Sequence, residues 1–313
     1  MPTRLAVEDF IVHVQETEIV PSRPYDFAAA LAFLQSSASA VLERIDGATY
    51  QRAWRRATGP ELVTVTAVGS VSSPRLRIRV QGHNADEDAL FAAVRAIRHI
   101  FSLDVDPRPF WALAETDPVV AGLVGKAIYA RPVLVADPFE SLVWAIIGQQ
   151  VAVGFAQTLR RALLRLAGEY VTWDGLLFPL MPPPHKLITL DEEALRQQHF
   201  SRAKIRYLVT AAHAVASGEL HFPSLAAMAP DAAMATLVRL PGIGRWTAES
   251  VLMRGLGVRT MWPAADLGLR RALSRAYALP VPLTELQTRD LARAWPGWEA
   301  WVAFFAWQSL QRP

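Results

Sequence analysis

One acidic residue near the C-terminal end of the chain stands where a carboxylate can do chemistry. Asp266 closes the run Pro263-Ala264-Ala265-Asp266, directly ahead of a helix predicted over residues 267–277. A carboxylate there can stabilise positive charge that develops on a bound substrate, and it can help to orient water. Aspartate is also a favoured helix N-cap, so Asp266 has a structural interpretation as well, and the two roles are compatible.

A glycine turn ahead of Asp266 suits the binding of phosphate. The run Leu240-Pro241-Gly242-Ile243-Gly244-Arg245-Trp246-Thr247 lies between two helical patterns, which together predict a helix-hairpin-helix. The glycines permit positive φ, and the amides of Gly242, Gly244 and Thr247 belong to the positive end of the second helix. Such amides hold a nucleic-acid backbone without reading its sequence. An ordinary pair of helices joined by a glycine turn is the alternative.

The composition describes a globular chain and excludes several kinds of site. Of 313 residues, 52% are hydrophobic and 19% are charged, which is enough apolar material for about two domains. Cysteine is absent, which excludes disulfides, thiol nucleophiles and cysteine-ligated zinc or iron–sulfur clusters. The seven histidines form no H-x-x-x-H pair, so we expect no zinc site. With no membrane-spanning apolar run and no signal peptide, we expect a cytoplasmic protein without a membrane partner.

Patterning along the chain predicts an α+β protein, with a small domain ahead of a mostly helical region. In the first hundred residues, a helix over 25–34 precedes strands at 62–66 and 75–80 and a helix over 90–101. Residues 171–190 are rich in proline and are predicted to be a loop. Further helices are predicted over residues 139–167, 192–197, 201–217, 230–239, 246–256, 267–277 and 299–310.

Basic residues are compatible with a nucleic-acid partner. All but three of the 32 lysines and arginines are arginine, whose guanidinium forks onto phosphate. Alternation places Arg75, Arg77 and Arg79 on one face of a strand, where they are either DNA contacts or an ordinary solvated face. The net charge of +3 is too small to decide between a nucleic-acid partner and an arginine-rich composition.

The hairpin and the loop that ends in Asp266 together resemble the signature of the helix-hairpin-helix (HhH-GPD) DNA glycosylase superfamily. The run Asp137-Pro138-Phe139-Glu140, followed by Gly148-Gln149-Gln150-Val151, is similar to the helix and turn that enter the DNA minor groove in that superfamily. Arg23-Pro24-Tyr25-Asp26 and Trp295-Pro296-Gly297-Trp298 resemble one branch, DNA-3-methyladenine glycosylase II. The resemblance covers nearly the whole chain.

The resemblance implies a fold of three parts. A small N-terminal domain with an antiparallel sheet is expected at residues 1–104. Two helical subdomains follow, one made of residues 105–135 and 259–313, and one of residues 136–258 that carries the hairpin.

The activity implied is that of a monofunctional glycosylase in base excision repair. It flips an alkylated base, of the 3-methyladenine or 7-methylguanine type, out of double-stranded DNA and hydrolyses its N-glycosidic bond. Asp266 is then the catalytic residue, and the chain is expected to act as a monomer. Trp246 stands where members with lyase activity have a nucleophilic lysine, so water is the expected nucleophile. A glycosylase for hypoxanthine or uracil, and a non-enzymatic DNA-binding protein that keeps the hairpin, stay as alternatives.

The resemblance also implies a pocket for the flipped base. Electron-rich rings select a cationic base by stacking on it. The implied pocket residues are Trp246, Trp307, Ser250 and Phe33. Ser250 departs from the family, which usually has tyrosine there, so the pocket is expected to be roomier or more polar. Glu249, beside it, has the interpretation of a solvated helix residue.

DNA contacts and one ion complete the implied site. The implied contacts are Gly242, Gly244, Thr247, Gln149 and Gln150. The side chain of Gln150 is expected to fill the gap that the flipped base leaves. A sodium or potassium ion is implied at the backbone carbonyls of Val238, Leu240 and Ile243, and no other cofactor is expected.

Overall fold

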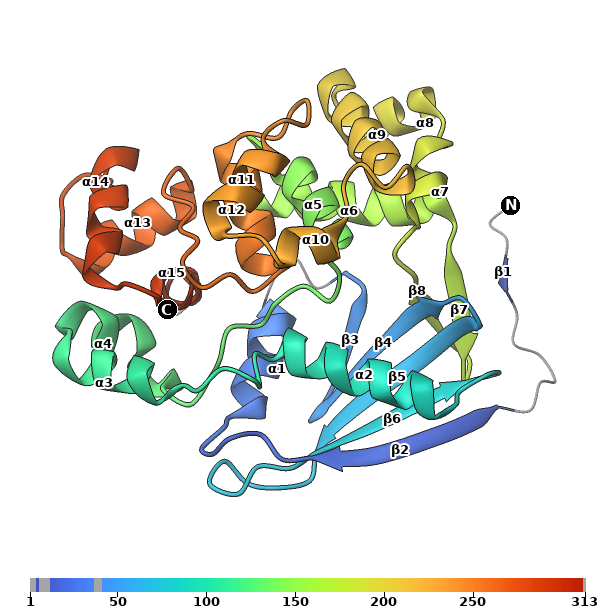
Figure 1. Cartoon of the computed structure of the whole chain (residues 1–313), viewed down its shortest axis with the longest axis horizontal. Helices are drawn as coiled ribbons and strands as arrows, with labels where there is room; N and C mark the ends of the chain where they lie inside the picture. The colour runs from blue at the N-terminus through green and yellow to red at the C-terminus, as the bar shows by residue number, and fades with distance from the viewer. Residues whose placement is uncertain (1–3, 6–11, 37–40, 312–313) are drawn as a thin grey trace.

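The computed structural model describes residues 4–5, 12–36 and 41–311 of the chain. Its N-terminal part is built on a five-stranded antiparallel sheet with the order β2-β6-β5-β4-β3 (Figure 1). The strands are β2 (His13–Ile19), β3 (Glu43–Asp46), β4 (Thr49–Arg56), β5 (Gly59–Ala67) and β6 (Leu76–Gly82). The predicted α+β class is confirmed, although the sequence patterns predict only β5 and β6.

Two helices share a core with this sheet. They are α1 (Phe27–Ser36) and α2 (Glu87–Ile100), which match the helices predicted over 25–34 and 90–101. Along β6, Leu76, Ile78 and Val80 are buried in that core. Because side chains alternate along a strand, the residues between them face outward.

The outward face of β6 carries arginines that are paired within the sheet. Arg77 Nη2 lies 3.0 Å from Glu18 Oε1 on the neighbouring strand β2, and Arg77 Nε lies 3.3 Å from Glu16 Oε1. Arg75 Nη1 lies 3.7 Å from Glu18 Oε2. These exposed pairs add little stability. They favour the solvated-face interpretation of Arg75 and Arg77 over DNA contact, because Glu16 and Glu18 lie beside their guanidinium groups.

A second sheet corrects one prediction. It has three strands, β1 (Arg4–Leu5), β7 (Tyr170–Trp173) and β8 (Leu176–Pro179). The loop predicted over 171–190 is therefore wrong. Asp174 and Gly175 form the turn between β7 and β8 with φ of 48° and 74°, as a type I′ hairpin requires. Tertiary contact explains the strands, because an apolar cluster joins this hairpin to the first sheet. Its members are Ala53, Leu62, Val171, Trp173, Phe178 and Leu180.

The rest of the chain is mostly helical, as predicted. The helices are α3 (Arg108–Thr116), α4 (Pro118–Val124), α5 (Pro138–Gly148), α6 (Val153–Ala167), α7 (Pro184–Ile188), α8 (Glu192–Gln197), α9 (Arg202–Ala216), α10 (Phe222–Ala226), α11 (Pro230–Leu237), α12 (Arg245–Arg254), α13 (Leu267–Ala276), α14 (Glu285–Leu291) and α15 (Glu299–Ser309), with 3₁₀ turns η1 (Gly125–Ala127) and η2 (Ala292–Ala294). Within the described residues, no helix is both long and apolar enough to cross a bilayer.

These helices form two groups. Figure 1 shows α3 and α4 beside α13 and α15, although more than half of the helical region separates them in sequence, and α4 contacts both α13 and α15. The helices from α5 to α12 form the other group. The division into residues 105–135 with 259–313, and 136–258, stays a prediction, and this packing supports it.

The helix predicted over 139–167 is interrupted. α5 begins after Asp137, whose Oδ1 accepts the amides of Phe139 at 2.8 Å and Glu140 at 3.1 Å. α5 ends at Gly148, and α6 does not begin until Val153. Gln150, between them, has φ of 53°, a left-handed value that a right-handed helix cannot contain. Residues 149–152 are therefore a turn, which we call the α5–α6 turn.

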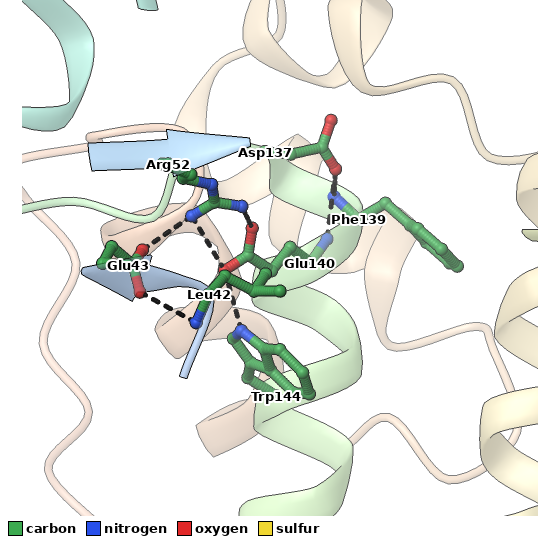
Figure 2. Close-up of polar contacts among 7 residues, drawn as sticks. All are labelled: Leu42, Glu43, Arg52, Asp137, Phe139, Glu140 and Trp144. Carbon is green, nitrogen blue, oxygen red and sulfur yellow. Dashed lines mark hydrogen bonds and ion pairs between the residues drawn. The ribbon is translucent and has the colours of Figure 1, made fainter. Parts of the chain in front are cut away.

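A buried cluster of charges fastens α5 to the first sheet (Figure 2). The guanidinium of Arg52 on β4 lies 2.6 Å from Glu43 Oε1 and also pairs with the carboxylate of Glu140 on α5. Trp144 Nε1 donates to Glu140 Oε1 at 2.8 Å. Burial raises the pKa of Glu43, and the charge of Arg52 opposes that shift. Glu140, in the segment predicted to enter DNA, is buried against the sheet, so only the other end of α5 is free to do so.

Candidate active site

The predicted hairpin is present between α11 and α12. Gly242 has φ of 83°, and a Cβ on it would lie 2.2 Å from ring atoms of Tyr207 on α9. Both the backbone conformation and the contact therefore require glycine. Gly244 is the N-cap of α12 and has open space around it. The first amides of α12 begin at this exposed end, where their partial positive charge suits an anion.

Asp266 lies where three helices meet. It is the N-cap of α13, and its Oδ1 accepts the amide of Leu269 at 2.8 Å. The same oxygen accepts Trp307 Nε1 on α15 at 2.9 Å, and Oδ2 accepts Trp246 Nε1 on α12 at 3.2 Å. The N-cap interpretation is confirmed. The residue is half-exposed, and one lone-pair position of Oδ2 is left for a substrate.

Two glycines lie close to the side chains that surround this carboxylate. A Cβ on Gly268 would lie 3.1 Å from Asp266 Oδ1 and 3.4 Å from Trp307 Cδ1, so a larger residue would crowd both. A Cβ on Gly148 would lie 3.7 Å from Trp246 Cη2, which places the Trp246 ring against the last turn of α5. Sequence reasoning missed Gly268, and its position two residues after Asp266 was the available signal.

The other predicted pocket residues lie nearby with different contacts. Ser250 Oγ donates to the carbonyl of Trp246 at 2.7 Å, so its hydroxyl is used within α12. Phe33, on α1, is buried with its ring centroid 4.6 Å from that of Phe304, one turn before Trp307 on α15. Their roles as pocket residues stay predictions.

Glu249 is wrongly interpreted as a solvated residue. Its side chain is 3% exposed, and its Oε1 lies 2.9 Å from both Arg245 Nε and Arg289 Nη1. This pair of contacts joins the start of α12 to α14. It also holds Arg245, which is half-exposed, at the exposed end of the hairpin.

The α5–α6 turn lies against the hairpin. Gln149 Nε2 donates to the carbonyl of Gly242 at 2.9 Å and to Thr247 Oγ1 at 3.0 Å. The amide nitrogen of Gln149 and the hydroxyl of Thr247 are thus bonded within the protein, and the roles of these two residues as DNA contacts stay predictions. Thr247 is buried, whereas Gln150 is exposed at the tip of the turn. The role of Gln150 in filling the gap stays a prediction.

One functional candidate escaped sequence reasoning altogether. Lys204, on α9, is 8% exposed, and its Nζ donates to the carbonyl of Gln149 at 2.5 Å and of Ile146 at 3.4 Å. Burial lowers the pKa of Lys204. No local pattern announces this contact, because Lys204 and Gln149 are 55 residues apart.

The carbonyls proposed for a cation belong to the same hairpin. Leu240 O accepts the amide of Ile243 at 3.0 Å, which leaves it one lone pair for an ion. The cation stays a prediction. In the described residues, no group of three or more histidine, aspartate or glutamate side chains could hold a metal.

A cavity of about 240 Å³ lies at the C-terminal end of α12, away from the hairpin. Its lining includes His99, Arg254, Trp301 and Phe304, and it does not include Asp266. Burial lowers the pKa of His99, and hydrogen bonds to the backbone of Val135 and Gly255 oppose that shift. This cavity is not the predicted base pocket.

Comparison with known proteins gives family matches over most of the chain. Residues 143–297 match the model described as HhH-GPD superfamily base excision DNA repair protein, and residues 20–131 match the AlkA N-terminal domain. The chain is 30% identical to DNA-3-methyladenine glycosylase of Bacillus subtilis over 217 residues, 69% of this chain and 72% of that protein. It is 28% identical to DNA-3-methyladenine glycosylase 2 of Escherichia coli over 91% of this chain and 94% of that protein.

A solved structure shows the same fold. It is the 3-methyladenine DNA-glycosylase from Archaeoglobus fulgidus, which superimposes with a TM-score of 0.81 at 24% identity. The match covers 93% of this chain and 97% of that one, so it includes both the sheet and the helical region.

Proposed function

The chain belongs to the HhH-GPD superfamily of base excision DNA repair proteins, and from this premise we propose that it excises alkylated bases from double-stranded DNA. It is a DNA glycosylase of the 3-methyladenine type, with bases such as 3-methyladenine and 7-methylguanine as substrates. One observation carries the proposal: a carboxylate is held by two indole N–H groups beside a turn that suits phosphate.

The reaction replaces a bond from sugar to base by a bond from sugar to water. As the N-glycosidic bond breaks, its electron pair leaves with the base and positive charge grows on the sugar. The carboxylate of Asp266 stabilises that charge. Water then adds to the same sugar carbon and loses a proton, which leaves an abasic site. An alkylated purine already carries positive charge, so it departs without a strong general acid.

Aromatic faces account for the choice of base. Both indole N–H groups point at Asp266, which fixes the edges of Trp246 and Trp307 at the carboxylate. A flipped cationic base that lies beside Asp266 then meets ring faces whose quadrupole attracts it. Gly268 keeps a side chain away from this edge of Trp307, because a Cβ there would lie 3.4 Å from Trp307 Cδ1. Ser250 and Phe33 are the further pocket residues that we propose.

The DNA is held and opened by two adjacent turns. The amides of the hairpin grip a phosphate on the backbone, and Gln150 at the exposed tip of the α5–α6 turn enters the stack where the base leaves. The chain works as a monofunctional enzyme and a monomer. Trp246 stands after the hairpin in place of a lysine, and the Nζ of Lys204 is bonded to carbonyls, so neither position supplies an amine to attack the sugar.

Base release tests this function directly. DNA treated with a methylating agent is incubated with the protein, and liberated purines are separated by chromatography. We expect 3-methyladenine and 7-methylguanine in solution and abasic strands that break only after alkali. Release of hypoxanthine or uracil from defined duplexes, without release of methylated purines, supports the alternative glycosylases. Binding to DNA without release of any base supports the non-enzymatic alternative.

A further inference from the structure

The α5–α6 turn is held by hydrogen bonds from two other elements. From α9, the ammonium of Lys204 bonds the carbonyls of Ile146 and Gln149, which end α5. From the hairpin, Gly242 O and Thr247 Oγ1 accept both amide hydrogens of Gln149. The exposed residue Gln150 follows directly. The tip of the turn is therefore tied to the segment that grips phosphate.

A lysine suits the first of these contacts. The last carbonyls of a helix lack amide partners and carry partial negative charge, so a cation there is favourable. Burying an ammonium is costly unless its protons are bonded, and the two carbonyls accept two of the three protons of Lys204, which is 8% exposed. A compact ammonium fits between two carbonyls, whereas the wide fork of arginine does not. Only three of the 32 basic residues in the chain are lysine, and one of these three makes this contact.

The second contact, from Gln149 to Gly242 and Thr247, joins the α5–α6 turn to the hairpin. Gly242 O belongs to the glycine whose left-handed conformation shapes the hairpin, and Thr247 lies in the first turn of α12. With both acceptors on one rigid segment, the amide of Gln149 has a single orientation. The distance between the hairpin amides and the tip at Gln150 is then fixed before DNA arrives.

We propose that Lys204 and Gln149 are positioning residues for base flipping, which set the tip at Gln150 in register with the phosphate that the hairpin grips. This inference rests on the proposed function. Neither residue touches the base or the sugar. Their loss leaves the phosphate contacts of the hairpin intact and displaces the tip, so extrusion of the base suffers more than binding of DNA.

Lys204→Met tests the first contact, with Lys126→Met as its control because Lys126 is exposed and lies outside the site. The Kd for undamaged duplex, the single-turnover rate of 7-methylguanine release and the thermal midpoint are measured for both. Since a shift of about 1 Å in a positioned group can cost about 100-fold in rate, we expect a loss of that order for Lys204→Met, with little change in Kd. A rate equal to that of Lys126→Met in a folded Lys204→Met protein overturns the proposal.

A second readout separates this proposal from the activity. 2-Aminopurine beside an abasic-site analogue fluoresces more when the stack opens, and no base is released in this assay. We expect the wild-type protein to raise the fluorescence and Lys204→Met to raise it much less. If the wild-type protein opens the stack but releases no base, the proposed function fails and the positioning role stands. Equal fluorescence for the two proteins overturns the positioning role.

The second contact has its own test, which also serves if Lys204→Met does not fold. Gln149→Leu and Thr247→Val each remove one side of a hydrogen bond, and a double-mutant cycle measures their coupling. We expect the double variant to open the stack about as poorly as Gln149→Leu alone, because the bond is already lost. Effects that add in full show that the two side chains act separately, and that result overturns the proposal.

Discussion

Replacing Asp266 with asparagine separates the charge of this side chain from its place in the fold. Asparagine caps a helix as well as aspartate does, so α13 keeps its start. Its carbonyl oxygen takes the place of Oδ1 and accepts Leu269 N and Trp307 Nε1, which now lie at 2.8 and 2.9 Å. Its NH₂ group then faces Trp246 Nε1, so two donors meet where Oδ2 accepted at 3.2 Å.

These contacts set the size of the two effects. The fold loses one hydrogen bond to a charged acceptor, which costs about 1.5–3 kcal/mol of stability at most. The reaction loses the charge that faces the developing cation, and losing one such electrostatic group typically slows a reaction about 100- to 1000-fold. We therefore expect Asp266→Asn to stay folded, to bind duplex DNA as the wild type does, and to release bases at least about 100-fold more slowly.

Asp117 offers a matched control. It is also an N-cap, of α4, where its Oδ1 accepts the amides of Val119 and Val120, and its Oδ2 accepts Trp295 Nε1 at 2.8 Å. In Asp117→Asn, the new NH₂ group therefore faces an indole N–H, that of Trp295, just as it faces that of Trp246 in Asp266→Asn. This control lies away from the proposed site.

The assay follows 7-methylguanine release in a single turnover with protein in excess, beside fluorescence anisotropy for binding. Normal release by Asp266→Asn refutes the assignment of this carboxylate. An equal loss in Asp117→Asn attributes the effect to the fold.

Three further outcomes follow from the contacts above. Trp307→Ala should lower the rate of 7-methylguanine release relative to that of hypoxanthine release, since the lost ring face stabilises a cation by about 0.5–2 kcal/mol. An unchanged ratio of the two rates rules out selection by this ring. Arg52→Met should lower the free energy of unfolding in urea by about 3–5 kcal/mol, because Glu43 and Glu140 stay buried without their cation; an unchanged midpoint contradicts this. Burial lowers the pKa of His99 in the folded chain. Below a pH of about 6.5, the usual pKa of histidine, the unfolded chain therefore binds a proton at His99 more readily than the folded chain does, and the free energy of unfolding falls as the pH drops. His99→Gln should flatten that slope, and an equally steep slope in the variant argues against it.

Short-range features of the site could be predicted because they depend on neighbours in sequence. A left-handed turn favours glycine, and Gly242 has φ of 83°. Asp137 and Asp266 each cap a helix by accepting backbone amides two or three residues later in the chain, which is why both mark helix starts. The same reasoning failed at residues 171–190, where proline content predicts a loop. Burial of Val171 and Phe178 against the first sheet outweighs that local preference.

Long-range contacts could not be predicted in this way. Arg52 and Glu140 are 88 residues apart, and neither has a local signal for burial. The resemblance implies that the helix begun at Asp137 and the turn that follows it approach DNA, and the structure turns Glu140, in the first turn of that helix, toward the sheet (Figure 2). Lys204 is one of three lysines, and no local pattern distinguishes it from the other two.

The sequence by itself determined the glycine turn, the lack of cysteine chemistry, the aspartate ahead of α13 and some of the helix starts, whereas the starts of α3, α4, α6, α7, α10 and α14 were not predicted. Only the tertiary structure decided what surrounds that aspartate. Trp246 and Trp307 are 20 and 41 residues from Asp266, and they reach it because α13 packs against α15 and the first turn of α12 comes close to Asp266. The packing of α5 on α12 turns Gln149 toward the hairpin and leaves Gln150 at the tip. The physical reason is that backbone preferences act over a few residues, whereas the direction of a donor toward a distant acceptor depends on how whole helices bury their apolar faces.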